Sequence, residues 1–174
     1  MEIKILGIRR EAVEADLIAL GAVKTFDGDI HALYYDFPDS SLAARHDVFR
    51  LRREGPESVL TFKKHLSDKQ AKVMEEREVR VSDFETARFI VESLGLGIWL
   101  EMKKHRTSYV LPGVRFELDR YGGRYSYVPE FLEIEAEDIE TVYRYASRLG
   151  FTAEDCKPWN TLQVAEYYAG GAER

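Results

Sequence analysis

Six pairs of charged residues, each with one residue between its members, are candidates for binding chemistry. In a β-strand, residues i and i+2 leave the same face, so each of these pairs would direct two charges the same way. Arginine and lysine suit phosphate oxygens, whereas carboxylates suit Mg²⁺ or Mn²⁺. Acid and base on one concave face would therefore suit a complex of a metal with a triphosphate. The six pairs are Glu2/Lys4, Arg50/Arg52, Glu76/Glu78, Lys104/Arg106, Glu117/Asp119 and Glu133/Glu135.

The pattern of these pairs leaves two interpretations open. The first is an antiparallel sheet with helices on one face and water on the other, where ion pairs form between neighbouring strands. The second is a closed or nearly closed barrel whose polar interior holds one small ligand. Arginine and glutamate recur where solvated strands usually mix threonine, serine, glutamine and lysine, which keeps the second interpretation open.

The elements that must position these charges are mostly strands. Alternation of apolar and polar residues predicts strands at 2–8, 48–53, 58–66, 73–81, 114–120 and 131–136, with further strands within 32–37 and 98–111. Pro112-Gly113 indicates a hairpin. Helices are predicted at 11–20, 84–94, 139–149 and 162–168, the second opened by Asp83 or Ser82 and the third by Asp138. The apolar face of the sheet is expected to carry the helices.

Composition narrows the class of protein. The 174 residues fit one domain over 1–174, and the formal net charge of -6 argues against binding a long nucleic acid or an anionic membrane. The apolar stretches are shorter than the roughly 20 residues of a membrane span, so a cytoplasmic location is the expectation. Cys156 is the single cysteine, which excludes an internal disulfide and a cysteine-based zinc site.

The order of the charged motifs resembles the CYTH superfamily, whose members include class IV adenylyl cyclases, thiamine triphosphatases and inorganic triphosphatases. The resemblance covers nearly the whole chain. It implies an α+β fold in which an eight-stranded antiparallel β-barrel, the triphosphate tunnel, has helices packed on its outside. The motifs are Glu2-Ile3-Lys4, Tyr34-Tyr35-Asp36-Phe37-Pro38, Arg50-Leu51-Arg52, Thr61-Phe62-Lys63, Glu76-Arg77-Glu78, Lys104-His105-Arg106, Leu118-Asp119 and Glu133-Ile134-Glu135.

The resemblance also implies roles for individual residues. Basic residues of the tunnel would bind phosphate, with Lys63 and Arg106 as the predicted catalytic residues, and acidic residues would hold Mg²⁺ or Mn²⁺. Glu76 and Glu117 are second choices for the metal. The family pattern opens Glu-x-Glu-x-Lys, and its first glutamate would precede Met1, so that ligand is missing or the natural start lies upstream. The implied phosphate-binding residues are Lys4, Arg50, Arg52, Lys63, Lys104 and Arg106, and the implied metal ligands are Glu2, Glu78, Asp119, Glu133 and Glu135.

Three functions fit these residues. The first is metal-dependent hydrolysis of an inorganic or small organic triphosphate, in which a positioned water attacks in line. The second is a class IV adenylyl cyclase that converts ATP to cyclic AMP and pyrophosphate. The third is a non-catalytic module that binds polyphosphate. The partner in each is a small triphosphate, and the sequence leaves a homodimer possible.

Overall fold

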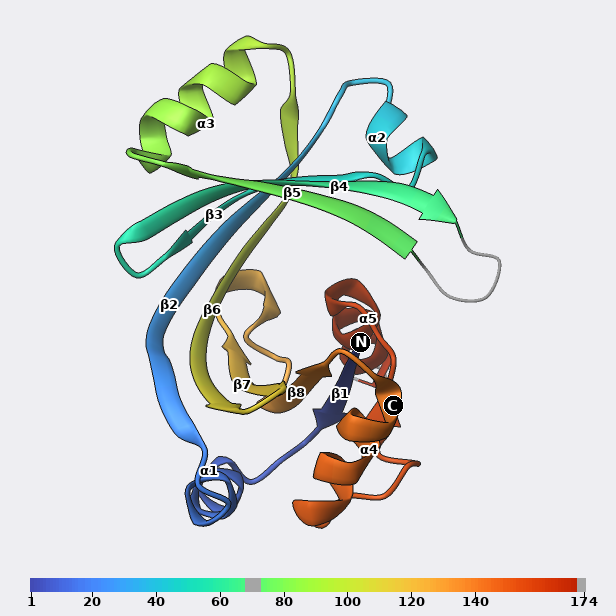
Figure 1. Ribbon diagram of the computed structural model, residues 1–174. Coiled ribbons are helices and arrows are strands. Elements are labelled where there is room, and N and C mark those ends of the chain that lie inside the picture. The colour runs from blue at the N-terminus through green and yellow to red at the C-terminus, as the bar shows by residue number, and fades with distance from the viewer. Residues whose placement is uncertain (68–72, 172–174) are drawn as a thin grey trace. The chain divides into compact units, whose positions relative to one another are not determined.

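The computed structural model describes residues 1–67 and 73–171, which form a sheet and helices (Figure 1). Over these residues the strands form a nine-stranded antiparallel sheet in the order β5-β4-β3-β2-β6-β7-β8-β1-β9. The strands are β1 (Glu2–Leu6), β2 (Val23–Asp36), β3 (Val48–Glu54), β4 (Glu57–Ser67), β5 (Val73–Val81), β6 (Gly97–Leu111), β7 (Val114–Tyr121), β8 (Phe131–Ala136) and β9 (Cys156–Lys157). The helices are α1 (Arg10–Ala19), α2 (Ser41–Ala44), α3 (Phe84–Ser93), α4 (Ile139–Arg148) and α5 (Thr161–Gly171), with a short 3-10 turn η1 (Gly123–Tyr125).

The predicted helices are all present, and the two acidic caps explain where α3 and α4 begin. Asp83 accepts a hydrogen bond from the backbone N–H of Thr86 at 2.7 Å, and Asp138 accepts one from Thr141 at 2.7 Å. Each cap satisfies a backbone N–H that has no partner within the helix. The antiparallel strands with helices beside them, predicted from alternation, are confirmed.

Three elements differ from the sequence prediction. β2 begins at Val23 rather than within residues 32–37, because its first half is polar and mostly exposed and so lacks an apolar alternation. The four-residue helix α2 and the two-residue strand β9 were not predicted. With β9 the sheet has nine described strands rather than the expected eight.

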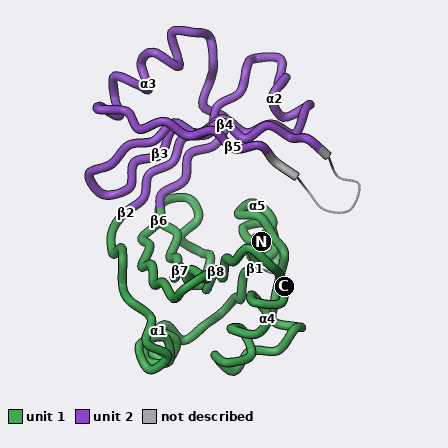
Figure 2. The backbone as a smooth tube through the Cα atoms, in the orientation of Figure 1, with its two compact units in different colours: residues 1–28, 104–174 green, residues 29–103 purple. Residues whose placement is uncertain are grey.

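The described chain forms two compact units (Figure 2). Unit 1 consists of residues 1–28 together with the described part of 104–174, and unit 2 consists of residues 29–103. A single domain over 1–174 stays a prediction. No helix in the described ranges is long and apolar enough to cross a membrane.

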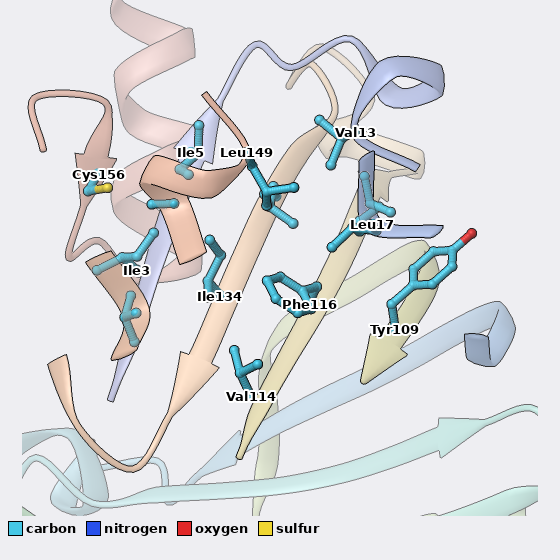
Figure 3. Packing of buried hydrophobic residues seen from close by; sticks show 14 of the residues in the cluster. Ile3, Ile5, Val13, Leu17, Tyr109, Val114, Phe116, Ile134, Leu149 and Cys156 are labelled. Carbon is cyan, nitrogen blue, oxygen red and sulfur yellow. The ribbon is translucent and has the colours of Figure 1, made fainter. Parts of the chain in front are cut away.

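The core of unit 1 lies on one face of its strands (Figure 3). Ile3 and Ile5 of β1 alternate with charged residues and pack in one cluster with Phe116 of β7 and Ile134 of β8. Helices α1 and α4 add residues such as Leu17 to the same cluster. Because alternate side chains leave opposite faces of a strand, the polar residues between these apolar ones lie on the other face.

The core of unit 2 follows the same rule. Phe84 and Val91 of α3 pack in one buried cluster with Leu33 and Tyr35 of β2 and Leu51 of β3. Arginines at 50 and 52 flank Leu51 in sequence and therefore leave the opposite face of β3. Helices α1 and α4 in unit 1, and α3 in unit 2, thus cover the apolar face of the strands and leave the charged side chains on the other.

Candidate functional site

The register of unit 1 lines up charged side chains across neighbouring strands. Lys4 of β1 is paired with Glu133 of β8, and Glu133 is paired with Glu117 of β7. One step along, Arg106 of β6 is paired with Asp119 of β7. These five residues are the buried charge cluster, and their exposed fractions run from 0% for Asp119 to 8% for Glu133. Charges buried to this degree must be paired, because an isolated buried charge lowers the free energy of unfolding by several kcal/mol.

Arg106 is the centre of the buried charge cluster. Its Nε donates to Oδ1 of Asp119 at 2.6 Å, and its Nη2 donates to Oδ2 of the same carboxylate at 2.5 Å. Its Nη1 forms an ion pair with Glu117, and Nη2 lies 3.6 Å from Oε2 of Glu133. One guanidinium therefore contacts three carboxylates that come from two different strands.

Two lysines complete the charge balance around Arg106. Nζ of Lys4 lies 3.2 Å from Oε2 of Glu133 and also contacts Glu2. Nζ of Lys104 donates to Oδ2 of Asp119 at 2.6 Å. The three cations Lys4, Lys104 and Arg106 thus face the three most buried carboxylates of unit 1, and the group is close to neutral.

The pKa values of the buried carboxylates diverge because their neighbours differ. Burial raises the pKa of Glu117 to about 7, against the opposing effect of Arg106. Burial also acts to raise the pKa of Asp119, but Lys104 and Arg106 outweigh it and hold that pKa well below its usual range. For Lys4, burial acts to lower the pKa, yet the charges of Glu133 and Glu2 leave it raised. Asp119 is therefore ionised at neutral pH, while Glu117 is the carboxyl closest to exchanging a proton.

The remaining predicted ligands of unit 1 are more exposed. Glu2 and Glu135 are paired with each other across β1 and β8, and both are exposed. Glu135 is also paired with Arg115 of β7, which is exposed as well. These residues form the next row of the same face and lie outside the buried charge cluster.

Unit 2 carries a second row of predicted site residues. Arg50 of β3 is paired with Thr61 of β4, and Thr61 is paired with Glu78 of β5. The Thr61 hydroxyl donates to Oε1 of Glu78 at 2.8 Å and accepts from Nη2 of Arg50 at 3.4 Å. The hydrogen bond from Thr61 is the largest cause of a lowered pKa at Glu78. Nε of Arg50 is buried and has no hydrogen-bond acceptor among the described residues.

The other predicted phosphate-binding residues of unit 2, Lys63 and Arg52, lie on either side of this row. Lys63 of β4 is paired with Glu76 of β5, and its Nζ lies 2.9 Å from Oε2 of Glu76. Arg52 lies two residues beyond Arg50 in β3, and its Nη2 is 3.3 Å from Oε2 of Glu54. Arg50, Arg52 and Lys63 are only partly buried, unlike Lys4 and Arg106 of unit 1.

The carboxylate oxygens of these rows fit Mg²⁺ or Mn²⁺ in chemical type. In this arrangement, however, Asp119 and Glu133 hold protein cations, and Glu78 accepts a hydrogen bond from Thr61. Over the described ranges, no group of three or more histidines, cysteines, aspartates or glutamates is arranged as a metal site. A metal would have to replace arginine or lysine as the partner of these carboxylates.

Sequence reasoning understated two residues. Glu117 was a second choice, yet it is 5% exposed and contacts Arg106 directly. Thr61 belongs to one of the motifs but was given no role, although it is fully buried between Arg50 and Glu78. The position of Thr61, two residues before Lys63 in β4, was the signal available for including it.

The strands of the described chain form an antiparallel sheet that carries buried charges of both signs. Comparison with known protein families identifies the family that has this arrangement. The model of the CYTH domain matches residues 1–148. The chain therefore belongs to the CYTH family. A search of curated proteins finds no match.

Several solved structures share this fold. The PH1012 protein from Pyrococcus horikoshii OT3 has a TM-score of 0.73 and 26% identity, over 94% of this chain and 99% of that chain. A conserved hypothetical protein from Pyrococcus furiosus has a TM-score of 0.74 and 27% identity, over 94% and 98%. An adenylyl cyclase candidate from Hippeastrum, described as revealing a dominant triphosphatase activity, has a TM-score of 0.66 and 17% identity, over 95% and 94%.

Proposed function

We propose that this chain hydrolyses a triphosphate, inorganic or small and organic, with the help of Mg²⁺ or Mn²⁺. The observation that carries the proposal is the buried charge cluster of unit 1, in a member of the CYTH family. Burying five ionisable groups is weak evidence for stability, because well-packed apolar residues often stabilise a protein equally well. A functional demand for charge at these positions explains their presence better. The triphosphatase activity described for the Hippeastrum protein fits this reading of the fold.

The basic residues supply donors for phosphate oxygens. Arginine presents a planar fork that can donate two parallel hydrogen bonds to phosphate, while lysine acts as a point charge. Arg50 retains a buried Nε without an acceptor among the described residues, so an anionic oxygen would satisfy it. Arg106 and Lys4 are held in place by carboxylates, which lowers the entropy they lose on binding. We assign phosphate binding to Lys4, Arg50, Arg52, Lys63, Lys104 and Arg106.

The acidic residues have two roles in this proposal. Asp119 and Glu133 orient Arg106 and Lys4 in the protein alone. We assign metal binding in unit 1 to Glu2, Asp119, Glu133 and Glu135, and in unit 2 to Glu78. A bound divalent metal would supply Lewis-acid polarisation of a phosphoryl oxygen. Lys63 and Arg106 are the residues to which we assign stabilisation of the charge that develops during phosphoryl transfer.

The test is to incubate purified protein with Mg²⁺ or Mn²⁺ and, separately, with tripolyphosphate, thiamine triphosphate and ATP, and then to identify the products. Orthophosphate release that depends on metal supports the proposal, and Glu133→Gln should reduce it at least tenfold. Glu137→Gln is the matched control, because Glu137 is exposed just beyond β8. Cyclic AMP with pyrophosphate would instead identify a cyclase. Binding without turnover would identify a polyphosphate-binding module.

A further inference from the structure

The imidazole rings of His46 and His65 meet in unit 2, and neither residue belongs to the proposed phosphate or metal residues. The ring centroids are 5.4 Å apart, and the ring planes lie at 67° to each other. His46 follows α2, whereas His65 lies in β4, so the contact joins two separate elements. His46 is exposed and His65 is partly buried, which leaves the pair accessible from solvent. Imidazole nitrogens suit Zn²⁺, Ni²⁺ and Cu²⁺, whereas carboxylate oxygens suit Mg²⁺ and Mn²⁺.

The backbone holds His46 in a left-handed conformation, with a φ of +59°. The N–H of His46 donates to the carbonyl of Ala43 at 2.9 Å, and the N–H of Asp47 donates to the carbonyl of Leu42 at 2.9 Å. These two bonds form the Schellman motif that ends α2, in which the left-handed residue is usually glycine. A side chain at such a position costs free energy, and strained residues gather at functional sites. The imidazole of His46 is therefore a candidate for a function.

Helix α2 is also fixed at its start. The buried carboxylate of Asp36 accepts hydrogen bonds from the backbone N–H groups of Phe37 at 2.7 Å, Leu42 at 2.9 Å and Ala43 at 2.9 Å. These bonds hold the turn after β2 and the start of α2 on one anchor. The short helix that precedes His46 is therefore held at both of its ends.

Asp47 ties the turn after α2 to β4. Its Oδ1 accepts a hydrogen bond from the backbone N–H of His65 at 2.9 Å, and its Oδ2 accepts one from Nε of Arg45 at 3.0 Å. The side chain of Asp47 is 6% exposed. Because Asp47 follows His46 directly and bonds the backbone of His65, one buried carboxylate sets the separation of the two histidines before any ion binds.

We propose that His46 and His65 together bind one transition-metal ion of the Zn²⁺, Ni²⁺ or Cu²⁺ type. Two imidazoles bound to one tetrahedral Zn²⁺, at Zn–N distances of about 2.0–2.1 Å, place their ring centroids roughly 5 Å apart. The separation of 5.4 Å fits this geometry. Among the described residues, no group of three such side chains is arranged as a metal site, so water would complete the coordination of the ion.

The bound ion would join the end of α2 to β4, and an ion that binds only the folded chain stabilises it. Calorimetry of the full chain with zinc chloride tests the site, in a phosphate-free buffer with excess Mg²⁺ to occupy the carboxylates. We expect one Zn²⁺ per chain, and His46→Ala and His65→Ala should each raise its Kd at least tenfold. Electron paramagnetic resonance of the protein with Cu²⁺ should show coupling to two imidazole nitrogens.

His46→Gly separates metal binding from folding, because glycine suits the left-handed position. Without metal, this variant should unfold at the same urea concentration as the unaltered protein or at a higher one, yet its Kd for Zn²⁺ should be at least tenfold higher. Zn²⁺ should raise the urea midpoint of the unaltered protein and leave that of His46→Gly unchanged.

His31→Gln is the matched control, since His31 contacts Glu101 and Phe84 instead, and its Kd for Zn²⁺ should stay within twofold. If the unaltered protein binds no Zn²⁺, or if His46→Gly and His65→Ala both keep its affinity, the two-histidine site is wrong. An equal loss in His31→Gln would indicate general binding to histidines and would also overturn the inference. The release of orthophosphate from tripolyphosphate is measured separately, so each of these results leaves the proposed function standing.

Discussion

The guanidinium of Arg106 and the carboxylate of Asp119 form a buried, two-point ion pair, with Nε at 2.6 Å from Oδ1 and Nη2 at 2.5 Å from Oδ2. The two residues are direct partners across β6 and β7, so the strand register itself brings them together. The same guanidinium reaches Glu117 and Glu133. Removing it would leave three buried carboxylates with only lysine partners.

The first prediction follows from this pair. Arg106→Met should lower the free energy of unfolding by about 3–5 kcal/mol, because removing one partner strands buried charge. Arg115→Met, on the exposed next row of the same face, should change it by less than about 0.5 kcal/mol. Urea unfolding of both variants at neutral pH measures the difference. Equal stabilities would mean that the carboxylates find other partners.

The second prediction concerns the pH dependence of the Asp36 anchor. Burial acts to raise the pKa of Asp36, but the N–H groups of Leu42, Ala43 and Phe37 outweigh it and leave the pKa lowered. A carboxyl with a lowered folded-state pKa stabilises the protein above its unfolded pKa of about 3.9, and that contribution is lost as the pH falls through the folded value. Asp36→Asn should therefore cost about 1–2 kcal/mol of unfolding free energy at pH 6.

The cost of Asp36→Asn should shrink as the pH falls below about 4, since the native aspartate then becomes protonated as well. Denaturant unfolding at a series of pH values measures this convergence. Asp16→Asn, at an exposed position of α1, is the control. A cost that stays constant down to pH 2 would show that the charge of Asp36 has no part in holding the turn.

The third prediction concerns anion binding by Arg50. Arg50→Ala should raise the Kd of tripolyphosphate at least tenfold, which is about 1.4 kcal/mol, because a two-point donor is lost. The Kd of Arg50→Lys should lie between those of the unaltered protein and Arg50→Ala, since lysine keeps the charge but lacks the planar fork. Arg77→Ala, with a side chain 80% exposed on β5, is the charge-matched control. Calorimetry in the absence of metal measures the contribution of Arg50 to tripolyphosphate binding. A tenfold effect of Arg77→Ala would instead indicate general charge attraction.

The fourth prediction concerns the order in which metal and triphosphate bind. Because the buried carboxylates of unit 1 are already paired with Lys4, Lys104 and Arg106, Mn²⁺ alone meets little net negative charge there. The protein with bound tripolyphosphate should bind Mn²⁺ at least tenfold more tightly than tripolyphosphate free in solution does. Electron paramagnetic resonance, which detects unbound Mn²⁺, measures both of these affinities. Tight binding of Mn²⁺ to the protein alone would contradict this order, because it would show that Mn²⁺ displaces the lysine and arginine partners of the carboxylates without triphosphate.

The sequence predicted the elements well where alternation was clear and caps were present. Strands 73–81 and 131–136 match β5 and β8 at both ends, and Asp138 caps α4 as expected. The first half of β2 escaped prediction because its polar, exposed residues carry no apolar period. β9 is too short to show any period and is defined by its pairing with β1.

The candidate site was predictable as a set of charges but not as a set of contacts. The i, i+2 spacing placed Glu117 and Asp119 on one face, but the sequence could not show that Arg106 would contact both. Thr61 carries no charge, so its place between Arg50 and Glu78 became evident only with the strand register. The contact between His46 and His65 depends on a turn whose shape is set by backbone hydrogen bonds, which leave no periodic signal.

The pairing of β9 with β1 bears on how much of the chain a stable fragment needs. The match to the family ends at residue 148, whereas Lys4 and Ile5 pair with Lys157 and Cys156. A fragment cut at residue 148 would expose the hydrogen-bonding edge of β1, and unprotected edge strands recruit other chains and promote aggregation. β9 therefore covers the edge of β1, the strand that carries Lys4, and keeps that edge from pairing with other chains.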